Sequence, residues 1–234
     1  MPIDSPAHRH PRHAIVVASG GLDSTVLAYW LAARGAELTL LSFDYGQRHR
    51  VELEYAAEIA RLLDCPHEIV DLAMLGSLLA GSALTDIDVP VPDGHYTDES
   101  MRATIVPNRN AIMLDIAVSL AVVRKADVVA FGAHAGDHAV YPDCRPEFVE
   151  RFTRSARTAN EGLLVGDFEL LAPFLTQSKT DIVRVGAAFG VPFEKTWSCY
   201  RGGTTHCGTC GTCTERKEAF QRNDIPDPTN YGSA

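Results

Sequence analysis

The sequence predicts an α/β fold, with a single parallel sheet, helices on both of its faces and a small metal-binding tail. Two observations predict it. Short apolar stretches alternate with amphipathic stretches along residues 14–195, which is the order of strands and helices in a parallel sheet. From residue 196 onward the composition changes to Cys, Gly and Thr, which is typical of a compact segment that closes around a metal ion.

The first half of the chain is expected to contain three strands and two helices. The apolar run at residues 14–18 predicts a strand, and a helix then extends from about residue 24 to residue 34, where Gly35 ends it. The next expected elements are a strand over 37–44, a helix over 51–63 and a strand over 67–72.

The second half begins with a long loop. Residues 76–105 are rich in Gly, Pro, Asp and Ser, so we expect a loop with one helical turn, and loops of this length are often functional lids. The remaining elements are expected as a helix over 110–125, a strand over 127–132, a helix over 145–160, a strand over 169–171 and a helix over 178–189.

The length of 234 residues suits one domain with a small appendage. The net charge of -9 disfavours a nucleic-acid binder, which normally presents a basic face. The chain start has no apolar stretch of a secretion signal, and no apolar run is long enough to span a membrane, so a cytoplasmic protein is expected. We divide the chain into a disordered leader (1–13), an α/β domain (14–195), a four-cysteine tail (196–222) and a C-terminal extension (223–234).

Residues 19–25, SGGLDST, join the first expected strand to the first helix. Glycines let the backbone approach an anion closely, and the helix start points free N–H groups at the same place, so this loop predicts a phosphate site. Asp23 is expected to hold Mg²⁺ or to cap the helix. The string lacks the Gly-Lys-Ser/Thr of kinase-type phosphate loops. It resembles the loop of the N-type ATP pyrophosphatase (PP-loop) superfamily, whose members split ATP into AMP and pyrophosphate.

This resemblance makes the domain over 14–195 an ATP-pyrophosphatase domain of the Rossmann-like, adenine nucleotide alpha hydrolase-like type. Asp44 ends the second expected strand, where doubly wound sheets place ligand groups, and is expected to face the adenosine or to serve the turn. The residues expected to bind ATP are Ala18, Ser19, Gly20, Gly21, Leu22, Asp23, Ser24, Thr25, Val26, Leu27, Ala28 and Asp44.

Four cysteines of the tail predict a metal centre: Cys199, Cys207, Cys210 and Cys213. Two-residue spacers let consecutive sulfurs converge on one ion, and four protein sulfurs leave no open position, so a structural Zn²⁺, one per chain, is expected. An iron–sulfur cluster is the alternative. His206 is a further ligand candidate, while Cys65 and Cys144 lie apart from the group.

Further motifs narrow the resemblance. They are FDYGQRH at 43–49, VPNRN at 106–110, GAH at 132–134 with Asp137, YPDCR at 141–145 and TWSCY at 196–200. Together with the loop and the tail they closely resemble the 7-cyano-7-deazaguanine synthase family, over residues 14–222. One departure is Ala18, where that family often has Phe before the Ser-Gly-Gly.

The resemblance implies that 7-carboxy-7-deazaguanine, ammonia and ATP give 7-cyano-7-deazaguanine, AMP and pyrophosphate, in queuosine or 7-deazapurine biosynthesis. Because an acid loses two oxygens on becoming a nitrile, two adenylations are expected, first of the acid and then of the amide. The resemblance also implies Mg²⁺ with the ATP and a homodimer. The chain has no glutaminase module, so ammonia is expected to arrive free or from a partner.

The expected catalytic residues are Asp23, Lys179 and Arg109. Lys179 opens a helix, an unfavourable place for a cation, and resembles a lysine that related enzymes place near the α-phosphate; otherwise it is a solvated lysine. Arg109 suits a carboxylate or phosphate, or is a surface residue. The expected substrate-binding residues are Arg48, His49, Asn108, Asn110, His134, Asp137, Tyr141 and Asp143.

Several of these roles have structural alternatives. Asn110 is also a natural helix cap, and Arg48 and His49 are also ordinary residues for the start of a helix. Either Asp137 or Asp143 is expected to accept hydrogen bonds from the amidine edge of the deazaguanine.

Three other functions compete with the nitrile synthase. One is another PP-loop enzyme, such as a tRNA thiolase or an NAD or GMP synthetase. The second is a related ligase that joins the deazaguanine acid to another amine. The third is a zinc-stabilised nucleotide-binding module without turnover, against which the intact loop and Lys179 argue.

Overall fold

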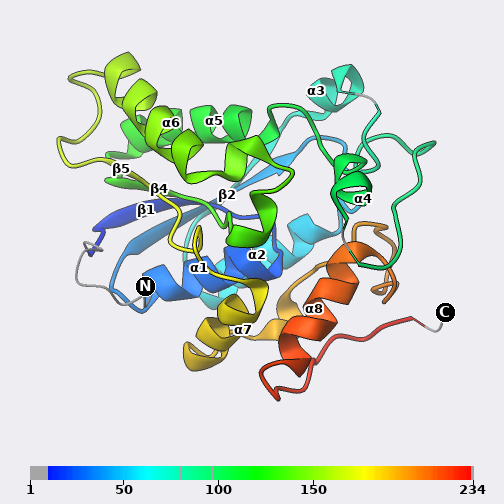
Figure 1. Cartoon of the computed structure of the whole chain (residues 1–234). Coiled ribbons are helices and arrows are strands. Elements are labelled where there is room, and N and C mark those ends of the chain that lie inside the picture. Colours follow the sequence, from blue (N-terminus) through cyan, green and yellow to red (C-terminus); the bar gives the residue numbers. More distant parts are fainter. Residues whose placement is uncertain (1–9, 80, 96, 233–234) are drawn as a thin grey trace.

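The computed structural model describes residues 10–79, 81–95 and 97–232, so residues 1–9 of the predicted leader lie outside the described residues, whereas His13, at the end of the predicted leader, belongs to the first strand. A five-stranded parallel sheet forms the centre of the protein (Figure 1), in the order β3-β2-β1-β4-β5. The strands are β1 (His13–Val17), β2 (Glu37–Asp44), β3 (His67–Asp71), β4 (Val128–Ala130) and β5 (Glu169–Leu171). The predicted α/β class is confirmed.

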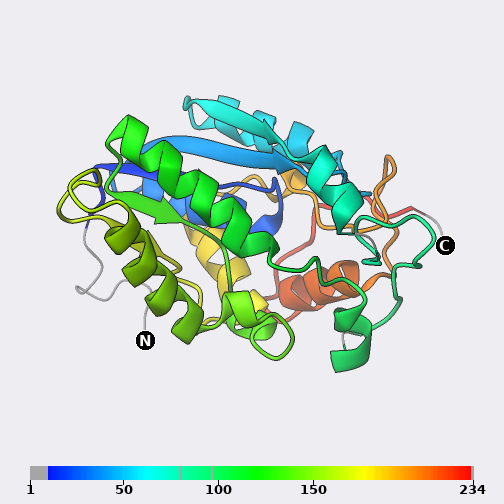
Figure 2. The ribbon, with the colours of Figure 1, turned by 90° about the horizontal axis from the view of Figure 1, so that it is seen from above.

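Helices cover both faces of the sheet, as Figure 2 shows from above. Helices α1 (Leu22–Ala32), α2 (Glu52–Leu62) and α7 (Lys179–Ala188) pack on one face, and α5 (Arg109–Arg124) and α6 (Pro146–Ala159) pack on the other. Each face has its own buried core, one around Trp30 and Leu31 of α1 and one around Leu114 and Val118 of α5. Apolar burial of this kind is the main source of stability in such a fold.

Some short elements differ from the expectation. The region predicted as a loop with one helical turn holds the end of α3 (Ala73–Leu78) and all of α4 (Asp98–Arg102). Helix α3 forms where Gly76 passes the carbonyl oxygen of Tyr45, so closely that a Cβ would lie 2.0 Å from that oxygen. Short 3₁₀ turns occur at η1 (Ala135–Asp137), η2 (Pro142–Cys144) and η3 (Phe193–Lys195). Among the described helices, none is long and apolar enough to cross a membrane.

The tail carries an eleven-residue helix, α8 (Gly211–Gln221), which the sequence did not indicate. Its side chains Ala219 and Phe220 belong to the core on the α1–α7 face, and the Phe220 ring meets that of Phe193 edge-on at 4.9 Å. The following segment is attached to the tail through Asp227, whose Oδ1 lies 3.1 Å from Nε of the buried Arg216. The tail is therefore packed into the main body.

Candidate active site and metal centre

Two adjoining cavities lie beyond the carboxyl ends of β1, β2 and β4, where parallel sheets place their ligands. The first cavity, of about 210 Å³, has an apolar floor of Val17, Phe43, Met113 and Phe131. The second cavity, of about 370 Å³, is closed partly by tail residues such as Trp197. The residues that line both cavities are Ser19, Asp23, His49, Glu52, Asp137, Tyr141 and Tyr200.

Residues 19–25 form a tight loop against these cavities. The Ser19 N–H donates to Ser24 Oγ and the Gly21 N–H donates to Ser19 Oγ, both over 3.2 Å. Gly21 is the residue before α1 and has no side chain with which to cap it, so first-turn N–H groups stay available to an anion. The Gly20 carbonyl accepts a 2.9 Å hydrogen bond from the Trp197 N–H, which ties the loop to the start of the tail. This geometry suits phosphate oxygens.

Replacing Gly20 with Ala is expected to raise the KM for ATP. Gly20 has a φ of +76°, and a Cβ there would lie 2.1 Å from the Glu52 carbonyl oxygen, so the loop must move. Backbone strain of a few kcal/mol corresponds to a rise of about tenfold or more. Gly35→Ala is the matched control, because Gly35 has a φ of +78° with nothing within 4 Å of its Cβ position. Titration with ATP measures both variants, and an unchanged KM in Gly20→Ala contradicts the prediction.

A group of charged side chains surrounds Lys179 in the second cavity. The Lys179 Nζ lies 2.5 Å from Asp23 Oδ2 and 3.7 Å from Glu215 Oε2 of α8. Burial favours the neutral amine, but the two carboxylates outweigh it and hold the pKa of Lys179 above its ordinary value. The His134 Nε2 lies 3.9 Å from Asp23 Oδ2 and 3.8 Å from Asp137 Oδ1. Lys179 is therefore a fixed positive charge beside the phosphate loop.

The other carboxylate oxygen of Asp23, Oδ1, indicates a binding site for a ligand. Oδ1 is buried and finds no hydrogen-bond partner among the described residues. Burying such an oxygen without a partner is costly, so it fits a metal ion or a donor brought in by a ligand.

The opposite wall is formed by α5. Arg109 Nη1 donates to Tyr45 Oη over 3.2 Å, and burial raises the pKa of Tyr45 to about 12, so the phenol stays neutral. Asn110 Nδ2 donates to Cys144 Sγ over 3.2 Å. Burial also raises the pKa of the Cys144 thiol well above its ordinary value. Cys144 is thus a poor nucleophile, and Arg109 is the cation of this wall.

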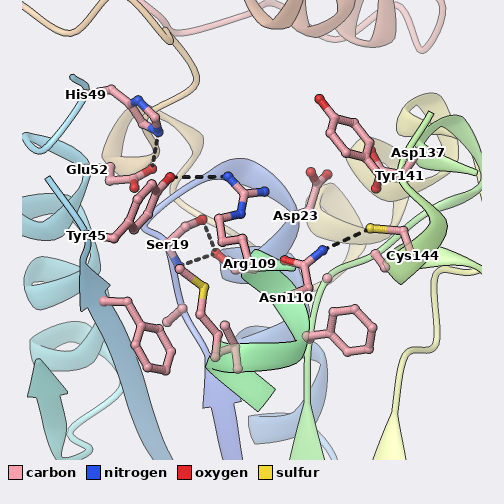
Figure 3. A pocket seen from close by; sticks show the side chains of 18 of the residues that line it. Ser19, Asp23, Tyr45, His49, Glu52, Arg109, Asn110, Asp137, Tyr141 and Cys144 are labelled. Carbon is pink, nitrogen blue, oxygen red and sulfur yellow. Dashed lines mark hydrogen bonds and ion pairs between the residues drawn. The ribbon is translucent and has the colours of Figure 1, made fainter. Parts of the chain in front are cut away.

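His49 and Glu52 form a buried pair on the far side of the first cavity from Asp137 and Tyr141 (Figure 3). The His49 Nε2 lies 3.5 Å from Glu52 Oε2, and Gln47 Nε2 donates to Glu52 Oε1 over 3.1 Å. Burial lowers the pKa of His49 to about 3 and raises the pKa of Glu52 to about 8. Both groups are therefore mainly uncharged at neutral pH.

Glu52 was missed by the sequence reasoning. One signal was present, because Glu52 shares a helix face with the buried Ala56 and Ile59, and a carboxylate on an apolar face is unusual.

The structure brings several predicted residues to the cavities: Ala18, Ser19, Gly21, Leu22, Asp23, Ser24, His49, Arg109, Asn110, His134, Asp137, Tyr141 and Lys179. Other predicted site residues lie away from the cavities. Val26, Leu27 and Ala28 have no exposed surface and pack in the core, so the structure removes their side chains from the candidate ATP contacts. Thr25 is likewise buried.

Four other candidates line neither of the two central cavities of the described structure, and the side chains of three of them have structural partners. Asp44 Oδ2 lies 2.5 Å from Arg50 Nε, and Arg48 donates to the carbonyls of Asp86 and Val89 in the long loop. Asp143 Oδ2 accepts the Asn110 backbone N–H and so caps α5. Asn108 precedes α5 in a left-handed conformation, and with Asp143 it lines a third cavity instead.

The four tail cysteines converge. The Sγ atoms of Cys199, Cys207, Cys210 and Cys213 all lie within 4.8 Å of one another. Backbone N–H groups of Cys207 and Cys210 donate to Cys199 and Cys207 sulfurs over 3.4 and 3.3 Å, as they do to metal-bound thiolates. His206 faces elsewhere, since its Nε2 accepts the Ser198 N–H. The cluster is fit to hold a metal ion.

Comparison with known proteins agrees with this architecture. A sequence profile described as "Queuosine biosynthesis protein QueC" matches residues 13–224. A 7-cyano-7-deazaguanine synthase of Allorhizobium ampelinum is 56% identical over 217 residues, which are 93% of this chain and 91% of that protein. A 7-cyano-7-deazaguanine synthase of Brucella ovis is 54% identical over 220 residues, 94% of each chain.

A solved structure shares the fold. It is the U34-tRNA thiolase NcsA from Methanococcus maripaludis with its 4Fe-4S cluster, at a TM-score of 0.50 and 16% identity, and the match covers 93% of this chain and 66% of the thiolase. That likeness concerns the fold alone. The profile match and the high identity to curated relatives show the family: this chain belongs to the QueC family of queuosine biosynthesis proteins.

Proposed function

We propose that this chain converts 7-carboxy-7-deazaguanine and ammonia to 7-cyano-7-deazaguanine at the expense of ATP. Relatives that carry the name of this synthase match it at 54–57% identity over more than nine-tenths of its length. The observation that carries the proposal is the meeting of the phosphate loop with Lys179 at the boundary of two cavities. One cavity can then hold the nucleotide and the other the acid that it activates.

The first cavity is assigned to the adenosine. Its apolar floor of Val17, Phe43, Met113 and Phe131 suits a flat base. From there the phosphates extend to residues 19–25, whose N–H groups receive the pyrophosphate. Asp23 is the residue that would hold Mg²⁺, since its Oδ1 is buried without a partner in the described chain and Mg²⁺ sites commonly combine one or two carboxylates with phosphate oxygens. The ion would offset negative charge on the phosphates.

The acid is assigned to the second cavity, with its carboxylate toward Lys179. In the first round the carboxylate oxygen attacks the α-phosphorus and the bond to pyrophosphate breaks. Ammonia then adds to the acyl carbon, AMP leaves and one proton is lost, which gives the amide. In the second round the amide oxygen attacks the α-phosphorus of a second ATP and pyrophosphate leaves, and loss of AMP and two protons then gives the nitrile. Lys179 stabilises the negative charge that develops in both attacks.

We also propose that the tail holds Zn²⁺, one per chain, in a structural role. Four sulfurs within 4.8 Å of one another suit a single tetrahedral ion and leave no open position. A four-iron cluster would need its four cysteines farther apart.

Product analysis tests the reaction. The protein is incubated with ATP, Mg²⁺, ammonium and 7-carboxy-7-deazaguanine, and the products are separated by mass spectrometry. Two AMP and two pyrophosphate per nitrile are expected. ADP and phosphate contradict the adenylation, a conjugate with another amine identifies the related ligase, and bound ATP without turnover identifies a nucleotide-binding module. A homodimer, a cytoplasmic location and an ammonia supply that is either free or from a partner remain predictions.

A further inference from the structure

The carboxylate that reads the deazaguanine base has to be found among several in the cavities. A 7-deazaguanine ring presents two donors, N1–H and the 2-amino group, beside one acceptor, the 6-oxo group. A protein reads such an edge with a carboxylate that accepts from both donors and an N–H that donates to the oxygen. The carboxylate must therefore face a cavity and keep an oxygen free.

Most of the carboxylates that could bind the base already have hydrogen-bond or ion-pair partners. Asp143 caps α5 through the Asn110 N–H and lines the third cavity. Asp137 Oδ2 accepts the His134 N–H over 3.1 Å, and Asp137 Oδ1 lies 3.8 Å from His134 Nε2, which is itself 3.9 Å from Asp23 at the reacting end. Asp23 and Glu215 lie 2.5 and 3.7 Å from Lys179, where the phosphates and the reacting carboxylate are placed. None of these is both free and distant from the reacting end.

Glu52 meets the requirement. It lines both cavities and is 8% exposed. Gln47 donates to Oε1 alone, and Oε2 lies 3.5 Å from Nε2 of the neutral His49, which is longer than a normal hydrogen bond. His49 is 3% exposed, and its Nδ1 finds no partner within residues 10–79, 81–95 and 97–232. The pair therefore has hydrogen-bonding capacity that the described protein leaves unused.

Resting on the proposed function, we propose that Glu52 accepts hydrogen bonds from N1–H and the 2-amino group of the base, and that His49 donates to its 6-oxo group. Tyr200, whose ring lies 5.1 Å from that of His49, lines the same cavities and offers a face on which the base stacks. The base then reaches across the cavity, so that its 7-carboxylate approaches Asp23 and Lys179. The pair selects a 2-amino-6-oxo base and disfavours an adenine-like edge.

Specificity for the 2-amino group tests the proposal. Wild-type protein is compared on 7-carboxy-7-deazaguanine and on the analogue without the 2-amino group, by kcat/KM for nitrile formation. A preference of about 100-fold is expected, the value of a hydrogen bond to a charged carboxylate. In Glu52→Gln the preference should fall below about tenfold, because one acceptor oxygen becomes a donor.

Controls separate the possible failures. Glu54→Gln changes an exposed carboxylate in the same turn of α2 and should keep the wild-type preference. If wild-type protein forms no nitrile, the proposed function fails. If it forms nitrile but accepts both bases equally, or if Glu52→Gln keeps the 100-fold preference, the assignment of Glu52 is overturned. The comparison on wild-type protein needs no variant to fold.

A pH series gives a second readout. Base binding requires the Glu52 carboxylate, and burial holds its pKa at about 8 in the free protein, so affinity should rise as pH increases from 6 to 8. The facing groups stay constant over this range: His49, with a pKa of about 3, and Tyr45, at about 12, are neutral, Gln47 does not titrate and Arg109 is charged. Calorimetric titration with 7-carboxy-7-deazaguanine should show this rise in affinity for the wild-type protein and no dependence on pH for Glu52→Gln. A flat wild-type profile overturns the proposal.

Discussion

Replacing Lys179 with Met is expected to lower kcat by about 10²–10³-fold, the usual effect of removing one group that stabilises developing charge. The ammonium lies 2.5 Å from Asp23 Oδ2, and the neighbouring carboxylates keep it charged. Met fills a similar volume, so the protein should fold while both adenylations slow. Rapid-quench measurement of AMP formation, with the acid and separately with the amide as substrate, follows each step.

Lys195→Met is the matched control for this prediction. Lys195 is an exposed residue of η3, 3.7 Å from Glu58 Oε1 on α2, and it lines neither central cavity in the described structure. Its replacement should leave kcat within twofold, since exposed ion pairs contribute little. A Lys179→Met protein that retains a third of the wild-type rate would place the catalytic charge elsewhere, with Arg109 as the next candidate.

Loss of the metal centre is expected to abolish activity altogether. Cys210 precedes α8 and Cys213 lies in its first turn, so an ion held by these cysteines would fix the start of that helix. Helix α8 carries Arg216, which donates to the Phe193 carbonyl over 2.9 Å and to Thr196 Oγ1 over 2.7 Å. The next residue, Trp197, donates to Gly20 of the phosphate loop. A structural change at the cysteines is therefore expected to reach the nucleotide site through α8, residues 193–197 and the phosphate loop.

Cys210→Ser tests this connection. The variant should bind less than a tenth of the wild-type metal by elemental analysis, form no nitrile and become sensitive to proteolysis within residues 196–222. Its Tm should fall by about 10 °C, as expected when several kcal/mol are lost from a chain of this size. Cys65→Ala, which removes a cysteine outside the cluster, should keep metal and activity. A metal-free Cys210→Ser protein with full activity contradicts the connection.

The fold could be predicted from the sequence because burial controls it. Both faces of a parallel sheet are covered, so its strands read as short apolar runs, such as AIVV within β1 and LLSF within β2. Helix α8 escaped prediction because its sequence, GTCTERKEAFQ, starts with Gly and Thr and carries a cysteine where an apolar residue would mark a face. That helix is stabilised by packing on α7 and by the cysteine cluster, which no local pattern reports.

The parts of the site that a single short segment forms could be predicted from the sequence. The loop over 19–25 and the four cysteines have fixed spacing, so they could be found directly. The residues that face one another from distant segments could not be assigned in this way. Asp143 and Asp137 are alike as sequence, yet one caps a helix and the other lines the cavities. Glu52 looked like an ordinary first-turn acid, which favours a helix start, until burial showed that it faces inward.

The shared wall of the two cavities has a kinetic consequence. If the nucleotide and the deazaguanine lie mainly in different cavities, which share a wall that includes Ser19, Asp23 and Glu52, AMP and pyrophosphate can depart while the half-converted base stays in place. The amide formed after the first adenylation would then remain bound for the second adenylation, without returning to bulk solution. A chase with unlabelled amide, added after the first adenylation, should leave the label in the nitrile, as in a processive enzyme.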